Sequence, residues 1–211
     1  MTISHEDWIA KQHHSIWRIA DPAWVYADIG ACRGELLSSF IRCMHKGHAF
    51  EPDPTNHQLL ASTLPNLHLS AGALTLNNLA VSNFIGSASF YFNGTHEGNL
   101  SGKDVRGEEH TDSCEVNCTT LDEYFKEREV HYIKIDTEGT EWDVFEGAKN
   151  LLERDILWQV EFHNDEDWHN IEKIYNYGYD LYNLDYNKLS KDSGRPYQAY
   201  LSKINLKKLI K

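Results

Sequence analysis

An acidic residue and two glycines follow the first apolar run of the sequence, in the segment Asp28-Ile29-Gly30-Ala31-Cys32-Arg33-Gly34. Gly30 can adopt a positive φ angle, and Gly34 allows a following helix to approach the strand closely. The apolar run predicts a parallel strand, and open α/β sheets bind ligands beyond the carboxyl ends of such strands. We therefore expect a small-molecule site here, although a turn that merely packs well is the alternative for this segment taken alone.

The chemistry of this turn favours S-adenosylmethionine (SAM) over a dinucleotide. A dinucleotide fingerprint needs glycines at positions i, i+2 and i+5, but counted from Gly30 the last two positions hold Cys32 and Glu35. The pyrophosphate of NAD would also meet the negative charge of Asp28. SAM carries an α-amino cation and a carboxylate, which suit Asp28 and the N-terminus of the following helix, respectively.

A second acidic residue, Glu51, follows the short apolar run Ala49-Phe50 and is flanked by Pro52 and Pro54. The prolines fix the turn that aims its side chain. An isolated Glu is usually a surface charge, but an acid after the second strand lies at the neighbouring switch point of the sheet, where it can accept both hydroxyls of a ribose. We therefore predict that the ligand carries adenosine and that Glu51 binds its ribose.

The segment Asp136-Thr137-Glu138-Gly139-Thr140-Glu141 places three carboxylates within six residues. Like charges repel unless a cation or a proton offsets them, so this cluster indicates a function. For Glu141, the dipole of a following helix is the better explanation. Asp136 and Glu138 are therefore the candidates for chemistry, together with His163, which follows the next predicted strand.

Short apolar runs alternate with segments of helical spacing, which predicts the α/β class. The runs end in Gly, Pro, Asp or Glu, as buried parallel strands do. They lie at 24–29, 48–50, 74–81, 132–135 and 156–162. Two later aromatic runs, 179–184 and 197–201, predict an antiparallel hairpin at the edge of a mostly parallel sheet that has helices on both faces.

The remaining segments complete the expected organisation. Residues 1–23 predict a helical segment packed on the core, and residues 24–211 a single domain. The alternating stretch 86–92 predicts an added strand at a sheet edge. The polar, glycine-containing stretch 93–113 predicts a loop that could gate access of the substrate.

Two segments carry the signal of a helix N-cap. Thr120 has the capping-box spacing to Glu123, which predicts a helix that ends at Glu127. Thr140 with Asp143 gives the same signal for a helix from 140 to 152. Both helices fit the alternation of strands and helices.

Charge and composition exclude several classes of function. The chain has 211 residues, with 20 Lys plus Arg against 32 Asp plus Glu and a net charge of −12, so nucleic-acid binding is not expected. The longest apolar stretches are far shorter than the ~20 residues that span a bilayer, which argues against membrane insertion. The N-terminus lacks the features of a secretory signal, so we expect a cytoplasmic protein with its four cysteines reduced.

Several segments together resemble the FkbM family of class I methyltransferases. They are Asp28-Ile29-Gly30-Ala31, Ala49-Phe50-Glu51-Pro52-Asp53-Pro54, Asn78-Leu79-Ala80-Val81-Ser82 and, most specifically, Lys134-Ile135-Asp136-Thr137-Glu138-Gly139-Thr140-Glu141. The resemblance implies a seven-stranded, Rossmann-like SAM-binding sheet and O-methylation of a sugar, a glycan or another small molecule. Cys32 departs from the pattern, because the family usually has Asn at that position.

The same resemblance implies roles for individual residues. Asp28, Gly30, Ala31 and Gly34 would line the methionine end of SAM, Glu51 would bind the ribose, and Asn78 and Ala80 would border the adenine. Asp136 would lie nearest to the transferred methyl group. We expect the acceptor to be a small molecule or a glycan.

Methyl transfer to a hydroxyl requires loss of the hydroxyl proton, because an alcohol is a poor nucleophile. Asp136 is the first candidate for the base and His163 the second, since a lone His after a strand is more often a structural hydrogen-bond partner. Alternatively, Asp136, Glu138, Glu161 and His163 bind Mg²⁺ or Mn²⁺, which lowers the pKa of the acceptor hydroxyl. The sequence leaves both mechanisms open.

Three other functions compete with this interpretation. A nucleic-acid methyltransferase would need an Asn/Asp-Pro-Pro-aromatic block after the fourth strand, where Asp136-Thr137-Glu138-Gly139 stands instead. A non-catalytic SAM- or nucleotide-binding module would have a blocked acceptor pocket. An NAD-dependent oxidoreductase would need the missing glycine triplet.

Overall fold

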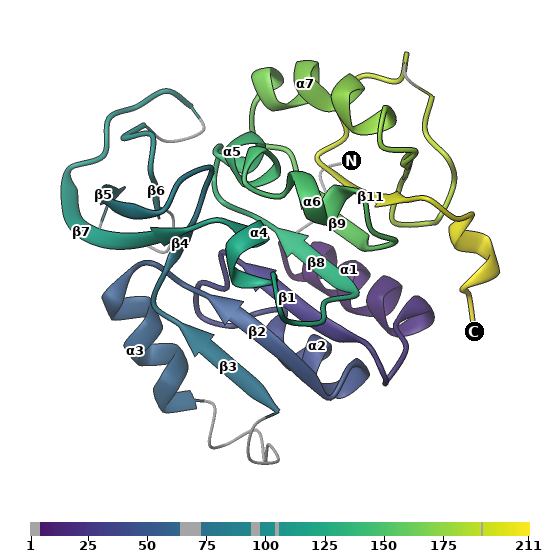
Figure 1. The fold of residues 1–211 in the computed structure, drawn as a ribbon, viewed down its shortest axis with the longest axis horizontal. Coiled ribbons are helices and arrows are strands. Elements are labelled where there is room, and N and C mark those ends of the chain that lie inside the picture. Colours follow the sequence, from purple (N-terminus) through teal and green to yellow (C-terminus); the bar gives the residue numbers. More distant parts are fainter. Residues whose placement is uncertain (1–4, 64–72, 94–97, 104–105, 191) are drawn as a thin grey trace.

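A computed structural model of the chain describes residues 5–63, 73–93, 98–103, 106–190 and 192–211. Its centre is a seven-stranded sheet with the strand order β10-β11-β9-β8-β1-β2-β3 (Figure 1). The strands are β1 (Val25–Ile29), β2 (Lys46–Phe50), β3 (Leu74–Asn77), β8 (Tyr132–Ile135), β9 (Leu157–Glu161), β10 (Asp180–Tyr182) and β11 (Gln198–Ser202). The predicted α/β class and seven-stranded sheet are confirmed.

The strands from β9 through β8, β1 and β2 to β3 pair in parallel, and β11 is antiparallel to both of its neighbours. This pairing confirms the predicted antiparallel hairpin at the C-terminal edge. The central strand β8 is buried on both faces: Ile133 and Ile135 belong to the core on one side, and Tyr132 to the core on the other. A continuous apolar run is what such a strand requires.

Helices cover both faces of the sheet. On one face, α1 (His5–Ile19), α2 (Leu37–Cys43) and α3 (Pro54–Thr63) enclose a cluster with Ile16, Phe40, Leu60 and Tyr132. On the other face, α4 (Leu121–Tyr124), α5 (Glu141–Glu146), α6 (Lys149–Leu152) and α7 (Asp165–Tyr175) enclose a cluster with Phe125, Phe145, Leu151, Trp158 and Ile174. In Figure 1, α4 and α5 lie in front of the sheet and α1 and α2 behind it. A short 3-10 helix, η2 (Leu206–Lys208), follows β11.

A second, smaller sheet lies beside the first, with the strand order β4-β7-β5-β6. Its strands are β4 (Ala80–Val81), β5 (Gly86–Phe92), β6 (Gly98–Asn99) and β7 (Asp112–Thr119). The single strand predicted for residues 74–81 is wrong, because the segment divides into β3 and β4, which belong to different sheets. Asn78 explains the division: its side chain donates hydrogen bonds to the Glu51 and Pro52 carbonyls, each at 2.9 Å, and the chain leaves the larger sheet there.

The strand predicted at 86–92 is confirmed as β5, but its predicted edge position is wrong, and so is the single loop predicted for 93–113. Residues 86–92 form an inner strand, because β5 pairs with β7 on one side and with β6 on the other. The stretch 93–113 is not a single loop, because β6 lies within it and β7 begins at Asp112; residues 94–97 and 104–105 of this stretch lie outside the described residues. The sequence does not predict β7, since only Val116 and Cys118 in that strand are buried.

The first predicted N-cap is confirmed. The Thr120 side chain accepts a hydrogen bond from the Glu123 N–H at 3.1 Å and begins α4. The helix ends at Tyr124, one turn earlier than predicted.

The second predicted helix, 140–152, is wrong in both its cap and its length. Thr140 makes no side-chain cap, and its hydroxyl donates to the Thr137 carbonyl at 3.2 Å. The segment forms two helices, α5 and α6, on either side of Gly147. A Cβ at Gly147 would lie 2.1 Å from the Ser82 carbonyl oxygen, so this position allows the small sheet to approach and the helix is interrupted there.

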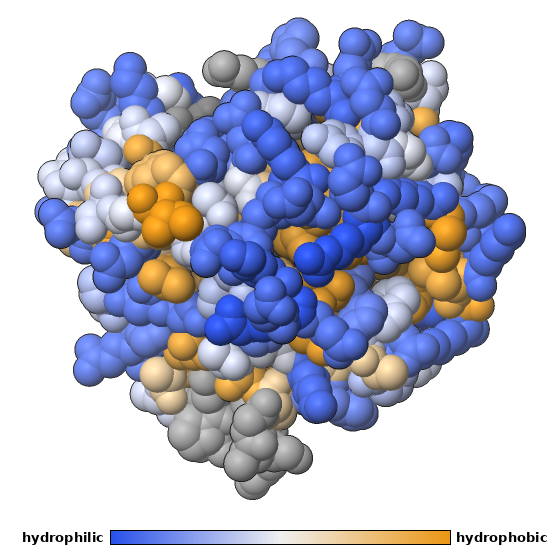
Figure 2. All heavy atoms as spheres, viewed as in Figure 1, coloured by the Kyte–Doolittle hydropathy of each residue, from blue (hydrophilic) through white to orange (hydrophobic). Residues whose placement is uncertain are grey.

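Hydrophilic residues cover most of the face shown in Figure 2, where apolar residues appear in separate groups. This surface agrees with the large excess of acidic residues in the sequence. Within the described part of the chain, no helix is long and apolar enough to cross a membrane.

Candidate functional site

A cavity of about 340 Å³ opens beyond the carboxyl ends of β1, β2, β8 and β9, which is a size typical of small-molecule sites. It brings together most of the residues that the sequence singled out. Among those residues, its wall includes Asp28, Gly30, Ala31, Glu51, Ala80, Asp136, Glu138 and Glu161. Gly34 and Asn78 lie outside the wall, and His163 contacts three of its acidic side chains.

The β1 turn, residues 28–34, touches the turn after β8 through Gly30. Gly30 has a φ angle of +77°, and a Cβ on it would lie 1.8 Å from the Asp136 carbonyl oxygen, so the close approach requires glycine. The N–H groups of Gly30 and Ala31 donate to the Phe50 carbonyl at 3.1 and 2.9 Å. The ends of β1, β2 and β8 therefore meet at the floor of the cavity.

Gly34 and Asn78 shape the cavity from outside its wall. Gly34 has a φ angle of +83°, and a Cβ there would lie 2.7 Å from the Leu60 side chain of α3. Asn78 holds the turn after β2 by its hydrogen bonds to the Glu51 and Pro52 carbonyls. Both residues position the segments that line the cavity.

Glu51 is almost fully buried, with 4 % of its surface exposed. Its Oε2 accepts a hydrogen bond from the Cys32 N–H (2.6 Å) and its Oε1 from the Asp53 N–H (2.9 Å). Burial raises the pKa of Glu51 to about 7, although both N–H groups oppose this shift. Cys32 has a φ angle of +49°, a region that Asn tolerates better than most residues, which gives a physical reason for the Asn that is usual in the family pattern.

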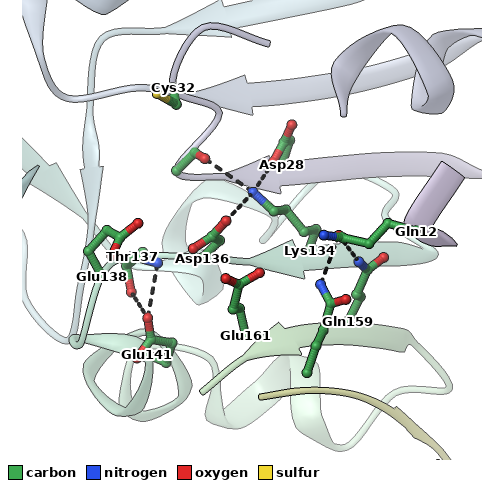
Figure 3. Close-up of polar contacts among 12 residues, drawn as sticks. Gln12, Asp28, Cys32, Lys134, Asp136, Thr137, Glu138, Glu141, Gln159 and Glu161 are labelled. Atoms are coloured by element: carbon green, nitrogen blue, oxygen red, sulfur yellow. Dashed lines mark hydrogen bonds and ion pairs between the residues drawn. The ribbon is translucent and has the colours of Figure 1, made fainter. Parts of the chain in front are cut away.

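Lys134 of β8 is a site residue that the sequence reasoning missed. Its side chain is 6 % exposed, and its Nζ lies 3.3 Å from Asp28 Oδ1 and 3.1 Å from Asp136 Oδ2 (Figure 3). The ammonium also donates to the Gly30 carbonyl at 3.2 Å. Burial alone would lower the pKa of Lys134, but the charges of Asp136 and Asp28 raise it, so the group is a cation. A lysine within an otherwise apolar strand was the signal that could have revealed it.

His163 is surrounded by carboxylates. Its Nδ1 lies 2.9 Å from Glu141 Oε1, and its Nε2 lies 3.5 Å from Glu138 and from Glu161 and 3.7 Å from Asp136. Burial by itself lowers the pKa of His163, but hydrogen bonds to Glu141 and Glu161 and the negative charges around the ring raise it to about 11. The imidazole is therefore a cation at neutral pH and cannot accept a proton.

The turn after β8, residues 136–140, has an unusual conformation. Glu138 has a φ angle of +55°, in the left-handed region that side chains other than Gly, Asn and Asp rarely adopt. The fully buried Glu141 holds this turn, because its Oε1 accepts hydrogen bonds from the Thr137 and Gly139 N–H groups at 3.1 and 3.0 Å. Glu141 therefore does more than complement the dipole of α5.

Asn99 of β6 connects the small sheet to this turn. Its side chain is buried and donates to the Glu138 carbonyl at 2.8 Å and to the Lys103 carbonyl at 2.6 Å. Its Oδ1 accepts from the Ser101 and Gly102 N–H groups at 3.0 and 3.1 Å. Asn99 and Glu138 are 39 residues apart, so the local sequence contains no signal for this contact.

Residues near the two ends of the chain complete the cavity wall. Trp8 and Gln12 of α1 lie on one side, and Tyr197, just before β11, lies close to them. The sequence predicts α1 only as a packing helix and the C-terminal hairpin only as an edge. Their meeting at the cavity is a property of the folded chain.

Comparison with known families connects this site to one family. The model of the methyltransferase FkbM domain matches residues 28–181. The matched region contains the β1 turn, Glu51, the turn after β8 and His163. A search of the curated proteins finds no match.

Solved structures share the fold at low sequence identity. An FkbM methyltransferase from Methylobacillus flagellatus aligns with a TM-score of 0.61 and 16 % identity over 86 % of this chain and 44 % of that protein. An rRNA methylase from Streptococcus thermophilus aligns with a TM-score of 0.53 and 13 % identity over 97 % and 99 % of the two chains. A SAM-dependent O-methyltransferase from Thermotoga maritima aligns with a TM-score of 0.53 and 11 % identity over 97 % and 67 %. The chain thus spans less than half the length of the first of these proteins, with which it shares its fold.

Proposed function

Since the chain belongs to the FkbM family of methyltransferases, we propose that it transfers a methyl group from SAM to a hydroxyl of a sugar, a glycan or another small molecule. One observation carries the proposal: Gly30, Glu51 and Asp136 line the same cavity. A glycine turn, an acid after the second strand and an acid after the fourth then share one space at the carboxyl ends of parallel strands. This is where an α/β sheet binds its ligand.

The donor would lie along the ends of β1 and β2. Asp28, Gly30 and Ala31 would face its methionine part, and Ala80 would border the adenine. Glu51 would accept the ribose hydroxyls with lone pairs that its bonds to Cys32 and Asp53 leave available. Gly34 and Asn78 would act on the donor only by positioning these residues.

Transfer is an in-line displacement, for which the enzyme must align the two substrates and exclude water. The acceptor hydroxyl gives its proton to Asp136, its oxygen forms a bond to the methyl carbon, and the carbon–sulfur bond breaks, leaving neutral S-adenosylhomocysteine (SAH). Lys134 holds Asp136 Oδ2, and among the described residues no group donates a hydrogen bond to the buried Oδ1. This oxygen is therefore the one we assign as the base.

The charge of His163 supports Asp136 as the base. A cationic imidazole at 3.7 Å from Asp136 Oδ1 would orient this carboxylate. Glu138, which also contacts His163, would contribute negative charge beside the sulfonium. We assign positioning roles to His163 and Glu138.

Metal-assisted transfer is a second mechanism that a specific observation favours. Asp136, Glu161 and His163 each offer one ligand atom, and these atoms lie within 4.8 Å of one another. An ion bound here would displace the proton that His163 otherwise carries, because only the neutral imidazole binds a metal. Glu141, which is hydrogen-bonded to Nδ1 of His163, would orient the imidazole. A carboxylate on the second ring nitrogen commonly orients histidines that bind a metal. Oxygen ligands with one imidazole suit Mg²⁺ or Mn²⁺, and a bound ion would lower the pKa of the acceptor hydroxyl.

Calorimetric titration of EDTA-treated protein with Mn²⁺ separates the two mechanisms. Metal-assisted transfer predicts saturable binding that Glu161→Gln weakens at least about tenfold, because one charged ligand is lost. Glu172→Gln, an exposed glutamate on α7, is the control. Absence of saturable binding, together with full transfer activity after EDTA treatment, would contradict the metal mechanism and leave the base mechanism in place.

The proposed function itself is tested by calorimetric titration with SAM, SAH and NAD. We expect SAM and SAH to bind and NAD not to bind; binding of NAD alone would contradict the proposal. Glu51→Ala should weaken SAM binding about tenfold or more, whereas Asp136→Asn should leave SAM binding nearly unchanged and slow transfer by about 10²-fold or more. Asp155→Asn, an exposed residue before β9, is the matched control.

A further inference from the structure

The cavity extends from the proposed donor site to a second end, over β9 and β11. Neighbouring strands lie about 4.8 Å apart, so β9 and β11 lie about 10 and 14 Å from β1, two and three strands away. The wall at this end consists of Trp8, Gln12, Glu161 and Tyr197. We call these four residues the far wall. None of them belongs to the turns that we assign to SAM.

Gln12 presents a hydrogen-bond donor of fixed orientation at the far wall. Its side-chain oxygen accepts two hydrogen bonds, from the side-chain amides of Gln159 and Gln198, both at 2.9 Å. The oxygen of Gln159 in turn accepts a hydrogen bond from the Tyr132 hydroxyl, which completes the network behind Gln12. Figure 3 shows the amide of Gln12 reaching from α1 toward Gln159 and Lys134.

The NH₂ group of Gln12 has two hydrogens and makes no hydrogen bond with any described residue, while the residue is only 3 % exposed and lines the cavity. The nitrogen is not among the fully enclosed polar atoms that lack a partner, so it is open to the cavity, where a ligand can satisfy it. Because the network behind Gln12 fixes its oxygen, the nitrogen cannot turn away from the cavity. This nitrogen is therefore a donor prepared for a ligand.

The aromatic residues of the far wall offer flat apolar surfaces. The Tyr197 ring is 52 % exposed and lies edge to face with Trp8, at 5.4 Å between ring centres. Burial and the neighbouring Glu161 carboxylate raise the pKa of the Tyr197 hydroxyl, so the polar end of the ring lies beside Glu161. The half-exposed ring is open on its side, an arrangement that suits the apolar face of a saturated ring.

The charges at this end disfavour an anionic ligand. Asp136, Glu138 and Glu161 line this part of the cavity. The ammonium of Lys134 is already shared between Asp28 and Asp136. Lys134 is the only Lys or Arg among the described residues that line the cavity, and the His163 imidazole behind the wall is already surrounded by carboxylates. A phosphate or carboxylate on the ligand would therefore be repelled.

We propose that the far wall is the acceptor site and that it binds an uncharged, hydroxyl-rich ring, such as a sugar without phosphate or carboxylate groups, or a cyclitol. Gln12 donates to one ring hydroxyl, Tyr197 and Trp8 cover the apolar face, and a neighbouring hydroxyl lies at Asp136 for transfer. This inference rests on the proposed methyl transfer, and it adds the class of acceptor and the residues that select it.

The test uses the full-length protein with SAM and a panel of ring compounds. The neutral probes are methyl glucoside, methyl galactoside, methyl mannoside and myo-inositol; the charged probes are glucose 6-phosphate and glucuronate. Methylated product is detected by mass spectrometry, and SAM binding is measured separately by calorimetry. We expect product from at least one neutral probe and none from the charged probes.

Variants assign the effect to the far wall. Gln12→Glu keeps an oxygen for Gln159 and Gln198 but removes the NH₂ donor, so KM for the neutral probe should rise about tenfold while the Kd of SAM changes less than about twofold. Tyr197→Leu removes an exposed ring without disturbing that network and should raise KM similarly. Gln58→Glu, on the exposed side of α3, adds the same charge as a control and should change neither value.

Three results would overturn the inference: no neutral probe is methylated although SAM binds, the charged probes are methylated as well as the neutral ones, or Gln12→Glu weakens SAM binding as much as acceptor binding. In each case the proposed methyl transfer would still stand on SAM binding. If SAM itself does not bind, the proposed function is wrong, which is a different result.

Discussion

The donor end and the far wall of the cavity are built in different ways. The donor end consists of the turns after two adjacent strands, β1 and β2, and its parts contact each other directly, as Cys32 and Glu51 do. The far wall joins α1 with β9 and β11, and Gln12 and Gln198 are 186 residues apart. In the proposed assignment, donor recognition would depend on short local segments, whereas acceptor recognition would depend on how segments near the two ends of the chain pack.

Asp136 lies between the donor end and the far wall, and both depend on it. Its carbonyl touches Gly30 of the donor end, and its carboxylate lies near His163 and the acidic side chains. The turn after β8 therefore couples the two ends. Substitutions at its different contacts should separate effects on the fold from effects on one end.

The largest effect is expected at the junction of the donor end with this turn. Gly30→Ala would place a Cβ 1.8 Å from a backbone oxygen, at a positive φ angle, and should lower the free energy of unfolding by more than about 4 kcal/mol. Gly107→Ala is the control, because Gly107 has a similar φ of +83° but no atom within 4 Å. It should cost only about 1–2 kcal/mol. Equal losses in urea unfolding would show that the close approach is not a constraint.

A slightly smaller loss is expected when the buried cation is removed. Lys134→Met would leave Asp28 and Asp136 without their shared partner and should lower the free energy of unfolding by about 3–5 kcal/mol. Lys188→Met removes an exposed ion pair with Asp180 and should have a much smaller effect, because solvent screens this pair. Urea unfolding of both variants measures the difference. A small effect at Lys134 would contradict the stabilising role of this shared ion pair.

A third prediction tests whether methyl transfer can be slowed without a change in SAM binding at the donor end. Asn99→Ala removes the link from the small sheet to the Glu138 carbonyl and should lower the free energy of unfolding by about 1–3 kcal/mol. Because Asn99 does not touch the β1 turn, the Kd of SAM should stay within about threefold while methyl transfer slows. Asn117→Ala on the exposed side of β7 is the control. Loss of SAM binding in Asn99→Ala would contradict the separation of the ends.

The smallest expected effect concerns pH. The pKa of Glu51 is about 7 in the folded protein, above its ordinary value of 4.5, so the folded state holds this proton more tightly than the unfolded state. Stability from this group is therefore greatest at low pH and is lost as pH rises through 7, by about 1 kcal/mol between pH 6 and 8. Glu51→Gln should remove this loss of stability between pH 6 and 8, as measured by urea unfolding at a series of pH values. If the free energy of unfolding of Glu51→Gln depended on pH as strongly as that of the unsubstituted protein, a group other than Glu51 would be responsible.

Much of the fold follows from the sequence because its signals are local. The runs that became β1, β8 and β9 are mostly apolar, with one or two polar or charged residues in each, and Thr120 has the spacing of a cap. The wrong predictions lie where contacts with residues distant in the sequence determine the local structure. Asn78 divides a predicted strand through contacts with the turn after β2, and Gly147 divides a predicted helix because Ser82 approaches it.

For the site, the sequence by itself determined which residues stand at the ends of strands: Asp28 lies near the end of one apolar run, Glu51 and Asp136 directly follow two others, and parallel strands bring such ends to one edge. The tertiary structure decided their charges and their partners. Lys134 neutralises two of these acids, His163 is held as a cation, and Gln12 presents its amide only because Gln198 packs behind it. Burial and charge depend on every group within a few ångströms, and most of those groups are far away along the chain.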